Sequence, residues 1–292
     1  MLLCALLTLT GCSRAVGTVT QESTIQTIVP VATFNSGSST SSLSKLDQAL
    51  LAAAQQKTAS PQQLELRLQT AELGMRSTVT APSSLAELGA MESSAYSQLV
   101  AQPAWQPTVM GLLPEGLRAI VRANMSAGSL IASLNALRTD LPHWHIQAPA
   151  APTDLLIYYH EGQQMYGIEW QYLAAINLAE TSMGRIRGLS SAGAQGPMQF
   201  LPSVWPYYST GDINNPRDAI LAAARYLTAH GGPQDMAHAL YRYDPSREYV
   251  NAVTLYAQQM QSDVRAFYGY YYWQVYVNTT RGPALLPEGF VN

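Results

Sequence analysis

The chain has 292 residues, which is longer than one average domain and favours one compact domain with an additional region. Hydrophobic residues make up 47% of it, an ordinary fraction for a globular protein. The net charge is −3 and no basic run is present, so we expect no nucleic acid as a partner.

Both cysteines lie in an apolar segment at the N-terminus that is too short to span a bilayer. Leu9-Thr10-Gly11-Cys12 looks like a bacterial lipobox, in which the cysteine is lipidated and becomes the mature N-terminus. We therefore expect residues 1–12 to be a lipoprotein signal and Cys12 to anchor an exported protein to a membrane. The segment lacks a basic n-region, so we expect a start further upstream, the alternative being a signal that does not function.

Residues 13–42 are rich in Ser, Thr and Gly, with few charges, and are predicted to be a flexible tether. Helical patterns begin at Leu43. They predict a helical N-terminal region over 43–140, as a small bundle or a coiled arm.

Two segments of this region resemble capping boxes, Ser60-Pro61-Gln62-Gln63 and Ser84-Leu85-Ala86-Glu87. A capping box marks a helix start, and Pro is favoured in the first turn, so helices are predicted over about 61–76 and 84–101. Another helix is expected from Pro114 to about Leu137.

Residues 141–153 contain three prolines and are predicted to be a semi-rigid, extended connector. They also contain His143-Trp144-His145, which suggests a metal site. No third His, Cys or acidic ligand follows at helical spacing, so we expect no metal. Trp144 is expected to pack onto the domain that follows.

Residues 154–292 show no alternating pattern longer than a few residues, so the fold class is predicted to be all-α. The dense aromatic tail Phe267–Tyr276 is expected to pack over this domain. The alternatives are that it lines the groove of the domain or forms a short strand. Helices are predicted over about 155–166, 169–182, from Pro202, 215–229, 234–242 and 245–260.

Glu180 ends the apolar stripe of one predicted helix, since Leu173 and Ile176 share its face. A carboxylate there is costly to bury, and the negative end of the helix dipole adds to the cost. Both effects raise a carboxyl pKa. The position therefore favours a general acid that keeps its proton near neutral pH.

The segment after Glu180 consists largely of small residues, from Ser190 to Gly196. Small side chains let the backbone approach a ligand closely and present its N–H and C=O groups. Met198 and Gln199 then supply an apolar contact and an amide. This segment is predicted to form a groove beside the acid.

Three ordered motifs in this region resemble the signature of the lytic transglycosylases with a lysozyme-like catalytic domain. They read Glu180-Thr181-Ser182, Gly196-Pro197-Met198-Gln199 and Ala239-Leu240-Tyr241-Arg242-Tyr243-Asp244. The resemblance covers about residues 155–262. It implies a lysozyme-like transglycosylase fold for the domain over 154–292.

The resemblance also implies a reaction, since these enzymes cleave peptidoglycan between N-acetylmuramic acid and N-acetylglucosamine with one protein carboxyl group. Glu180 would protonate the leaving oxygen while the substrate's acetamido group stabilises the positive centre. Glu180 would then remove the proton of the sugar's 6-hydroxyl, which closes a 1,6-anhydro ring without water. We expect peptidoglycan as the partner and no cofactor, in a protein that faces the cell wall.

Matching the motifs assigns further residues to substrate binding. Tyr243 resembles the tyrosine whose hydroxyl orients the acid, and Ser190 aligns with a serine that contacts substrate. Met198 and Gln199 would bind sugar rings and acetamido groups. A core tyrosine is the alternative for Tyr243, and turn chemistry is the alternative for Ser190.

Two residues depart from the family's motifs. Pro197 replaces the usual Leu, which removes a backbone donor and fixes φ. Asp244 replaces the usual Asn just before Pro245 and is expected to cap the last helix equally well. Asp lacks the amide donor of Asn, so we do not expect the contacts that the Asn would make as a donor. Asp244 also brings a second carboxylate, which is expected near the site.

Two other functions stay open. A lysozyme-type hydrolase of the same fold would need Asp244, Asp212 or Asp218 to activate water. The other is an inactive peptidoglycan-binding protein, which the presence of Glu180, Gln199 and Tyr243 disfavours.

Overall fold

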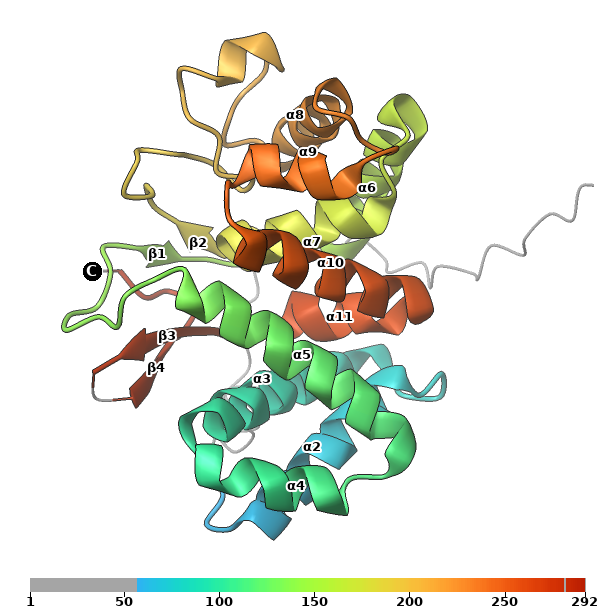
Figure 1. Cartoon of the computed structure of the whole chain (residues 1–292), viewed down its shortest axis with the longest axis vertical. Coiled ribbons are helices and arrows are strands. Elements are labelled where there is room, and N and C mark those ends of the chain that lie inside the picture. The colour runs from blue at the N-terminus through green and yellow to red at the C-terminus, as the bar shows by residue number, and fades with distance from the viewer. Residues whose placement is uncertain (1–56, 281, 292) are drawn as a thin grey trace, which may run out of the picture. The chain divides into compact units, whose positions relative to one another are not determined.

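The computed structural model describes residues 57–280 and 282–291. Cys12 with its lipobox, and the tether expected over 13–42, lie outside these residues. The described chain is mainly helical, with two small antiparallel sheets, so the predicted all-α class is confirmed (Figure 1). None of the helices in this part of the chain is both long enough and apolar enough to cross a membrane.

The N-terminal helices lie close to their predicted ranges, except that the helix expected to reach about Leu137 ends at Ser133. Ser60 caps the first helix by accepting from the backbone N–H of Gln63, as predicted. The side chain of Ser84 makes no such bond, and a short 3-10 turn precedes the next helix instead. The four helices are α2 (Pro61–Arg76), α3 (Leu85–Ala101), α4 (Gln106–Leu112) and α5 (Glu115–Ser133).

These four helices enclose a core of their own, which favours the bundle over the coiled arm. Leu64, Leu68, Leu99, Leu113 and Val121 are completely buried in it. The sequence did not predict α4, because seven residues are too few to show a full apolar repeat.

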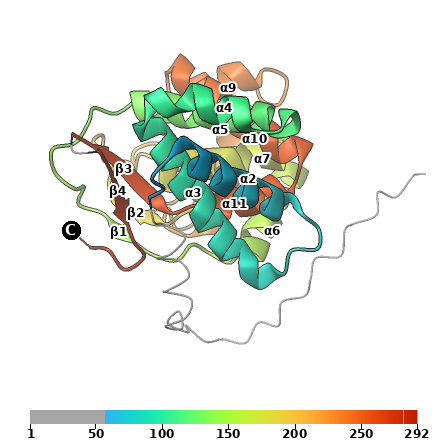
Figure 2. The same ribbon diagram turned by 90° about the horizontal axis from the view of Figure 1, so that it is seen from below.

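The C-terminal helices pack on the bundle. Helix α5 runs along α10 (Arg247–Ser262), and α3 packs against α11 (Arg265–Tyr272), as Figures 1 and 2 show. The described residues all belong to one compact unit. The domain boundaries predicted from the sequence stay predictions. The helices are α6 (Pro152–Tyr166), α7 (Trp170–Thr181), α8 (Pro216–Ala229), α9 (Met236–Tyr243), α10 (Arg247–Ser262) and α11 (Arg265–Tyr272).

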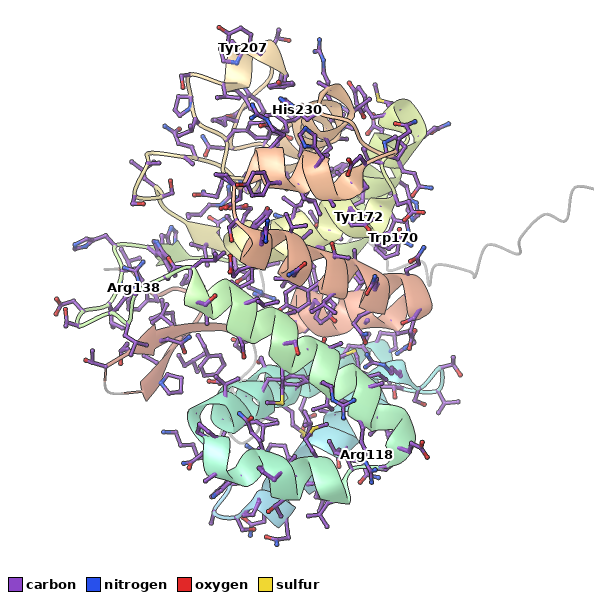
Figure 3. All side chains as sticks on the ribbon, viewed as in Figure 1. Arg118, Arg138, Trp170, Tyr172, Tyr207 and His230 are labelled. Carbon is purple, nitrogen blue, oxygen red and sulfur yellow. The ribbon has the colours of Figure 1, made fainter. Side chains whose placement is uncertain are left out.

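The loop between α7 and α8 carries the small-residue segment. The helix expected from Pro202 is only a 3-10 turn, Trp205–Tyr207, and Tyr207 projects from it with 75% of its surface exposed (Figure 3). The predicted cap of α8 is present, because Asn215 accepts from the backbone N–H of Asp218.

The expectation that Asp244 caps the last helix is wrong. Ser246 is the N-cap of α10, and its hydroxyl accepts from the backbone N–H of Tyr249 at 3.2 Å. Asp244 instead ends α9, where its own N–H donates to the carbonyl of Leu240. The backbone of Asp244 is extended, as expected for a residue before Pro245, so the helix starts later.

Two small sheets hold the connector and the tail. Strand β1 (His145–Ile146) pairs with β2 (Ile186–Arg187), and β3 (Val275–Thr279) forms a hairpin with β4 (Gly282–Leu286). The aromatic tail therefore divides. Its first part is α11, with Phe267 and Tyr270 buried, and its last part enters β3.

Candidate active site

Glu180 lies in the last turn of α7, a helix that is buried over most of its length. Leu173 and Ile176 on its face are completely buried, as the apolar stripe predicted, while Glu180 is half-buried where the stripe meets solvent. The helix ends at Thr181, and the next two residues, Ser182 and Met183, both have a positive φ. The chain therefore turns away directly after the acid.

The end of α7 is tied to the loop that follows it. Asn177 donates to the carbonyl oxygen of Pro197 at 2.8 Å, and the Thr181 hydroxyl donates to the same oxygen at 2.6 Å. Gly196 has φ +74°, and a Cβ there would lie 1.9 Å from the carbonyl oxygen of Ile213. Only glycine fits this close approach of two backbones.

Tyr249 is the residue that contacts the acid. Its hydroxyl donates to Oε1 of Glu180 at 2.7 Å from the first turn of α10. The sequence reasoning missed this residue because the third motif ends at Asp244. Ser246 marks the start of α10 three residues earlier, but no sequence signal says which way the tyrosine points.

Three neighbouring effects set the pKa of Glu180. Burial raises it most, the hydrogen bond from Tyr249 lowers it, and the nearby charge of Asp244 raises it, with a result of about 7. A carboxyl group with this pKa is partly protonated at neutral pH and is able to donate a proton or to accept one.

Tyr243 does not make the contact expected of it. Its hydroxyl donates to the carbonyl oxygen of Met198 at 2.6 Å, so it supports the loop rather than the acid. Its ring lies parallel to that of Tyr249, with centroids 6.5 Å apart. The expected orienting contact with Glu180 is thus made by Tyr249.

The loop residues differ in what they offer a ligand. Ser190 accepts from the backbone N–H groups of Ala192 and Ala194, which is turn chemistry, although it also lines the pocket. Gln199 lines the pocket too, and its amide donates to Gly196 O at 3.0 Å. The side chain of Met198 is completely buried, and its expected binding of sugar rings stays a prediction.

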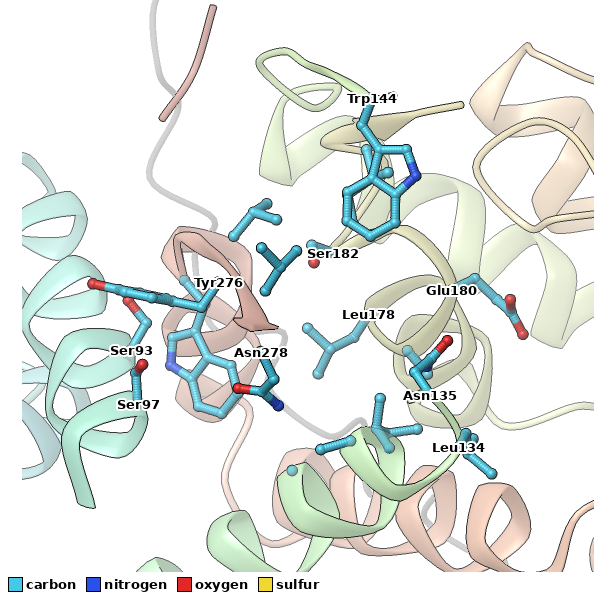
Figure 4. Close-up of a pocket in the computed structure, with 18 of the residues that line it drawn as sticks. Ser93, Ser97, Leu134, Asn135, Trp144, Leu178, Glu180, Ser182, Tyr276 and Asn278 are labelled. Atoms are coloured by element: carbon cyan, nitrogen blue, oxygen red, sulfur yellow. The ribbon is translucent and has the colours of Figure 1, made fainter. Parts of the chain in front are cut away.

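A pocket of about 600 Å³ opens beside Glu180 (Figure 4). Tyr249, Gln199 and Asp244 line it on the side of the acid. The other two aspartates considered as bases have structural contacts. The carboxylate of Asp218 accepts from the backbone N–H of Asp212. The carboxylate of Asp212 accepts from the backbone N–H of Asn214.

The similarity to known proteins falls on this part of the chain. Residues 157–246 match the family model described as Transglycosylase SLT domain. This stretch contains Glu180, Gln199 and Tyr243. Both the helical fold and the match fit a lysozyme-like catalytic domain, as expected.

One curated relative shares part of the chain. The membrane-bound lytic murein transglycosylase F of Thiobacillus denitrificans (strain ATCC 25259 / T1) is 34% identical over 79 residues. The alignment covers 27% of this chain and 17% of that relative's length. No solved structure matches the chain. These similarities support the expectation of a lytic transglycosylase.

Proposed function

We propose that this protein is a peptidoglycan lytic transglycosylase that cleaves the β-1,4 bond between N-acetylmuramic acid and N-acetylglucosamine. One observation carries the proposal. Inside the stretch that matches the SLT family, Glu180 has a pKa of about 7, accepts from Tyr249 and lines the pocket.

Glu180 serves first as the acid. Its proton passes to the glycosidic oxygen as the bond to the N-acetylmuramic acid ring breaks, and the substrate's acetamido group stabilises the positive carbon. The resulting carboxylate is stabilised by the hydroxyl of Tyr249.

Glu180 then serves as the base. It takes the proton of the 6-hydroxyl of the same sugar, whose oxygen attacks the positive carbon and closes a 1,6-anhydro ring. The acid is restored and water is not consumed. A single protein carboxyl group therefore completes the reaction, whereas hydrolysis of the lysozyme type uses two.

A hydrolase is the second candidate, because Asp244 lines the same pocket and its charge raises the pKa of Glu180. In that reading Asp244 would activate water. An inactive binding protein is the third, and the proton-donating setting of Glu180 argues against it.

The proposed setting is the cell wall. Lipidation of Cys12 would hold the protein at a membrane, and residues 13–42 would let the catalytic part reach the peptidoglycan. The curated relative is named membrane-bound, which fits this setting. A role in cell-wall remodelling follows from the reaction.

The substitution Glu180→Gln tests the proposal. The amide keeps the volume of the side chain but cannot donate a proton, so digestion of purified peptidoglycan should slow by about 10²–10⁴-fold. Glu169→Gln is the matched control, because Glu169 is exposed just before the same helix and should stay active. A Glu180→Gln protein that keeps more than about a tenth of the wild-type rate would place the acid elsewhere.

A further inference from the structure

Much of the pocket wall comes from outside the stretch that matches the SLT family. Asn135 follows α5, Trp144 lies in the connector and Asn278 lies in β3, and all three line the pocket that holds Glu180. Figure 4 shows the indole of Trp144 pointing into the pocket, with Glu180 to one side of it and Asn278 to the other. We call these three residues the outer wall.

Trp144 is held in place from two directions. The guanidinium of Arg138 lies 5.3 Å from the centre of its ring, a cation–π arrangement. On another side the indole touches Gly188, where an added Cβ would lie 2.6 Å from Cδ1 of the ring. An indole fixed in this way presents a large contact surface at little cost in side-chain entropy.

The two asparagines supply polar groups across the pocket from the indole (Figure 4). Both side chains are exposed, and within residues 57–280 and 282–291 neither amide has a hydrogen-bond partner. Each amide has two donors and one acceptor oxygen. Such groups match the hydroxyl and acetamido groups of an amino sugar, and the indole matches the apolar face of its ring.

The pocket is also large enough to hold more of a glycan than the one sugar ring beside Glu180. Its volume of about 600 Å³ lies within the range of sites that enclose whole ligands, roughly 300–1,000 Å³. The pocket continues from Glu180 past Leu178 to the outer wall. A glycan chain bound at the acid therefore has space to continue along it.

We propose that the outer wall is a second saccharide-binding surface, which holds the glycan strand on one side of the bond to be cleaved. Trp144 stacks on a sugar ring, Asn135 and Asn278 bond its polar groups, and Arg138 is a positioning residue for Trp144. The proposal rests on the proposed function for the identity of the ligand. It assigns substrate recognition to a part of the chain outside the SLT match.

Binding to the inactive Glu180→Gln protein tests this without cleavage. The probe is a peptide-free tetrasaccharide of alternating N-acetylglucosamine and N-acetylmuramic acid, followed by calorimetry. Adding Trp144→Ala should weaken binding by about tenfold, the loss typical of an aromatic anchor. Adding Tyr207→Ala instead, which removes an exposed aromatic ring that does not line the pocket, should leave the Kd unchanged.

Further variants separate stacking from damage to the fold. Trp144→Phe should restore part of the affinity, and Gly188→Ala should weaken binding because its methyl group displaces the indole. The exposed pair Asn135→Ala with Asn278→Ala should weaken binding without changing the melting temperature. In the active protein, Trp144→Ala should raise KM more than it lowers kcat.

The outcomes distinguish this inference from the proposed function. Equal affinity in the Trp144→Ala and Tyr207→Ala proteins would overturn the outer wall, even if the wild type cleaves peptidoglycan. The outer wall would also be overturned if a protein that lacks both asparagines and carries Trp144→Ala bound the tetrasaccharide as tightly as the protein that keeps all three residues. Loss of affinity with Trp144→Ala in a protein whose wild type cleaves nothing would uphold the outer wall and reject the enzymatic function.

Discussion

Burial raises the pKa of Glu180, and two neighbours then change it in opposite directions: the hydroxyl of Tyr249 lowers it and the charge of Asp244 raises it. The protonated form is the one that donates to the leaving oxygen. It predominates below the pKa of about 7 and is lost as the pH rises through it. We expect cleavage to fall with rising pH, with an alkaline limb near pH 7. A rate that stays level up to pH 9 would exclude Glu180 as the acid.

Tyr249→Phe removes the hydrogen bond that stabilises the charged carboxylate. Its loss raises the pKa of Glu180, so the alkaline limb should move to higher pH while the maximal rate falls. The pH dependence of kcat/KM measures both effects. Tyr243→Phe is the matched control, because its hydroxyl donates to the carbonyl of Met198 instead. It should move the limb less. A larger shift with Tyr243→Phe would restore the role first expected of that residue.

Asp244→Asn should move the limb the other way, because it removes the negative charge that raises the pKa of Glu180. The transglycosylase proposal predicts that this variant stays active, with its alkaline limb at lower pH. Under the hydrolase alternative the same change removes the base and should cost roughly 10²-fold or more at every pH. The pH–rate profile therefore separates the two functions at one residue.

At the scale of single elements, the sequence predicted those features that depend on local chemistry. The starts of α2 and α8 follow from Ser60 and Asn215, whose side chains accept from backbone N–H groups as expected. The buried face of α7 likewise follows from the spacing of its apolar residues, and that face led to Glu180.

The sequence failed where a tertiary contact decides the outcome. Asp and Ser are both favoured at the N-cap of a helix, and of Asp244 and Ser246 it is Ser246 that caps α10. Met198 and Tyr243 were assigned to substrate binding by their motifs. Met198 is buried, and its carbonyl oxygen accepts from the hydroxyl of Tyr243. Tyr249 reaches Glu180 across 69 positions of sequence, which no local pattern reveals.

At the scale of the whole molecule, a buried polar network joins the N-terminal helices to α11. Glu72 of α2 pairs with Arg76 and accepts from the hydroxyl of Tyr96 in α3. Asn124 of α5 donates to that hydroxyl at 2.9 Å and accepts from Tyr270 of α11 at 2.6 Å. The network fixes how four helices meet beside the pocket, whose wall includes Tyr96 and Asn124.

Glu92 lies beside this network with no hydrogen-bond partner for Oε2 among the described residues. Burial first, and then the charge of Glu72, raise its pKa well above the usual range. The folded protein therefore holds a proton on Glu92 that the unfolded chain releases above its ordinary pKa. The stability that this proton supplies is present at low pH and is lost as the pH rises through the folded pKa.

Glu92→Gln should remove this dependence, because the amide is neutral at every pH. The free energy of unfolding of the wild type should fall from pH 5 to pH 8, by up to about 1.4 kcal/mol per pH unit for each proton. Glu180, whose pKa is also raised, contributes with the same sign in both proteins. Urea unfolding at several pH values measures the difference. Parallel curves for the two proteins would mean that Glu92 is ionised in the fold.

The measurement that tests the central claim most directly is mass analysis of the products released from purified peptidoglycan. If Glu180 completes the reaction with the sugar's own 6-hydroxyl, the muropeptides end in 1,6-anhydro-N-acetylmuramic acid, one water lighter than hydrolytic products. The Glu180→Gln protein should release almost none of them. Products with ordinary reducing ends, lost again in Asp244→Asn, would contradict the account and identify a hydrolase.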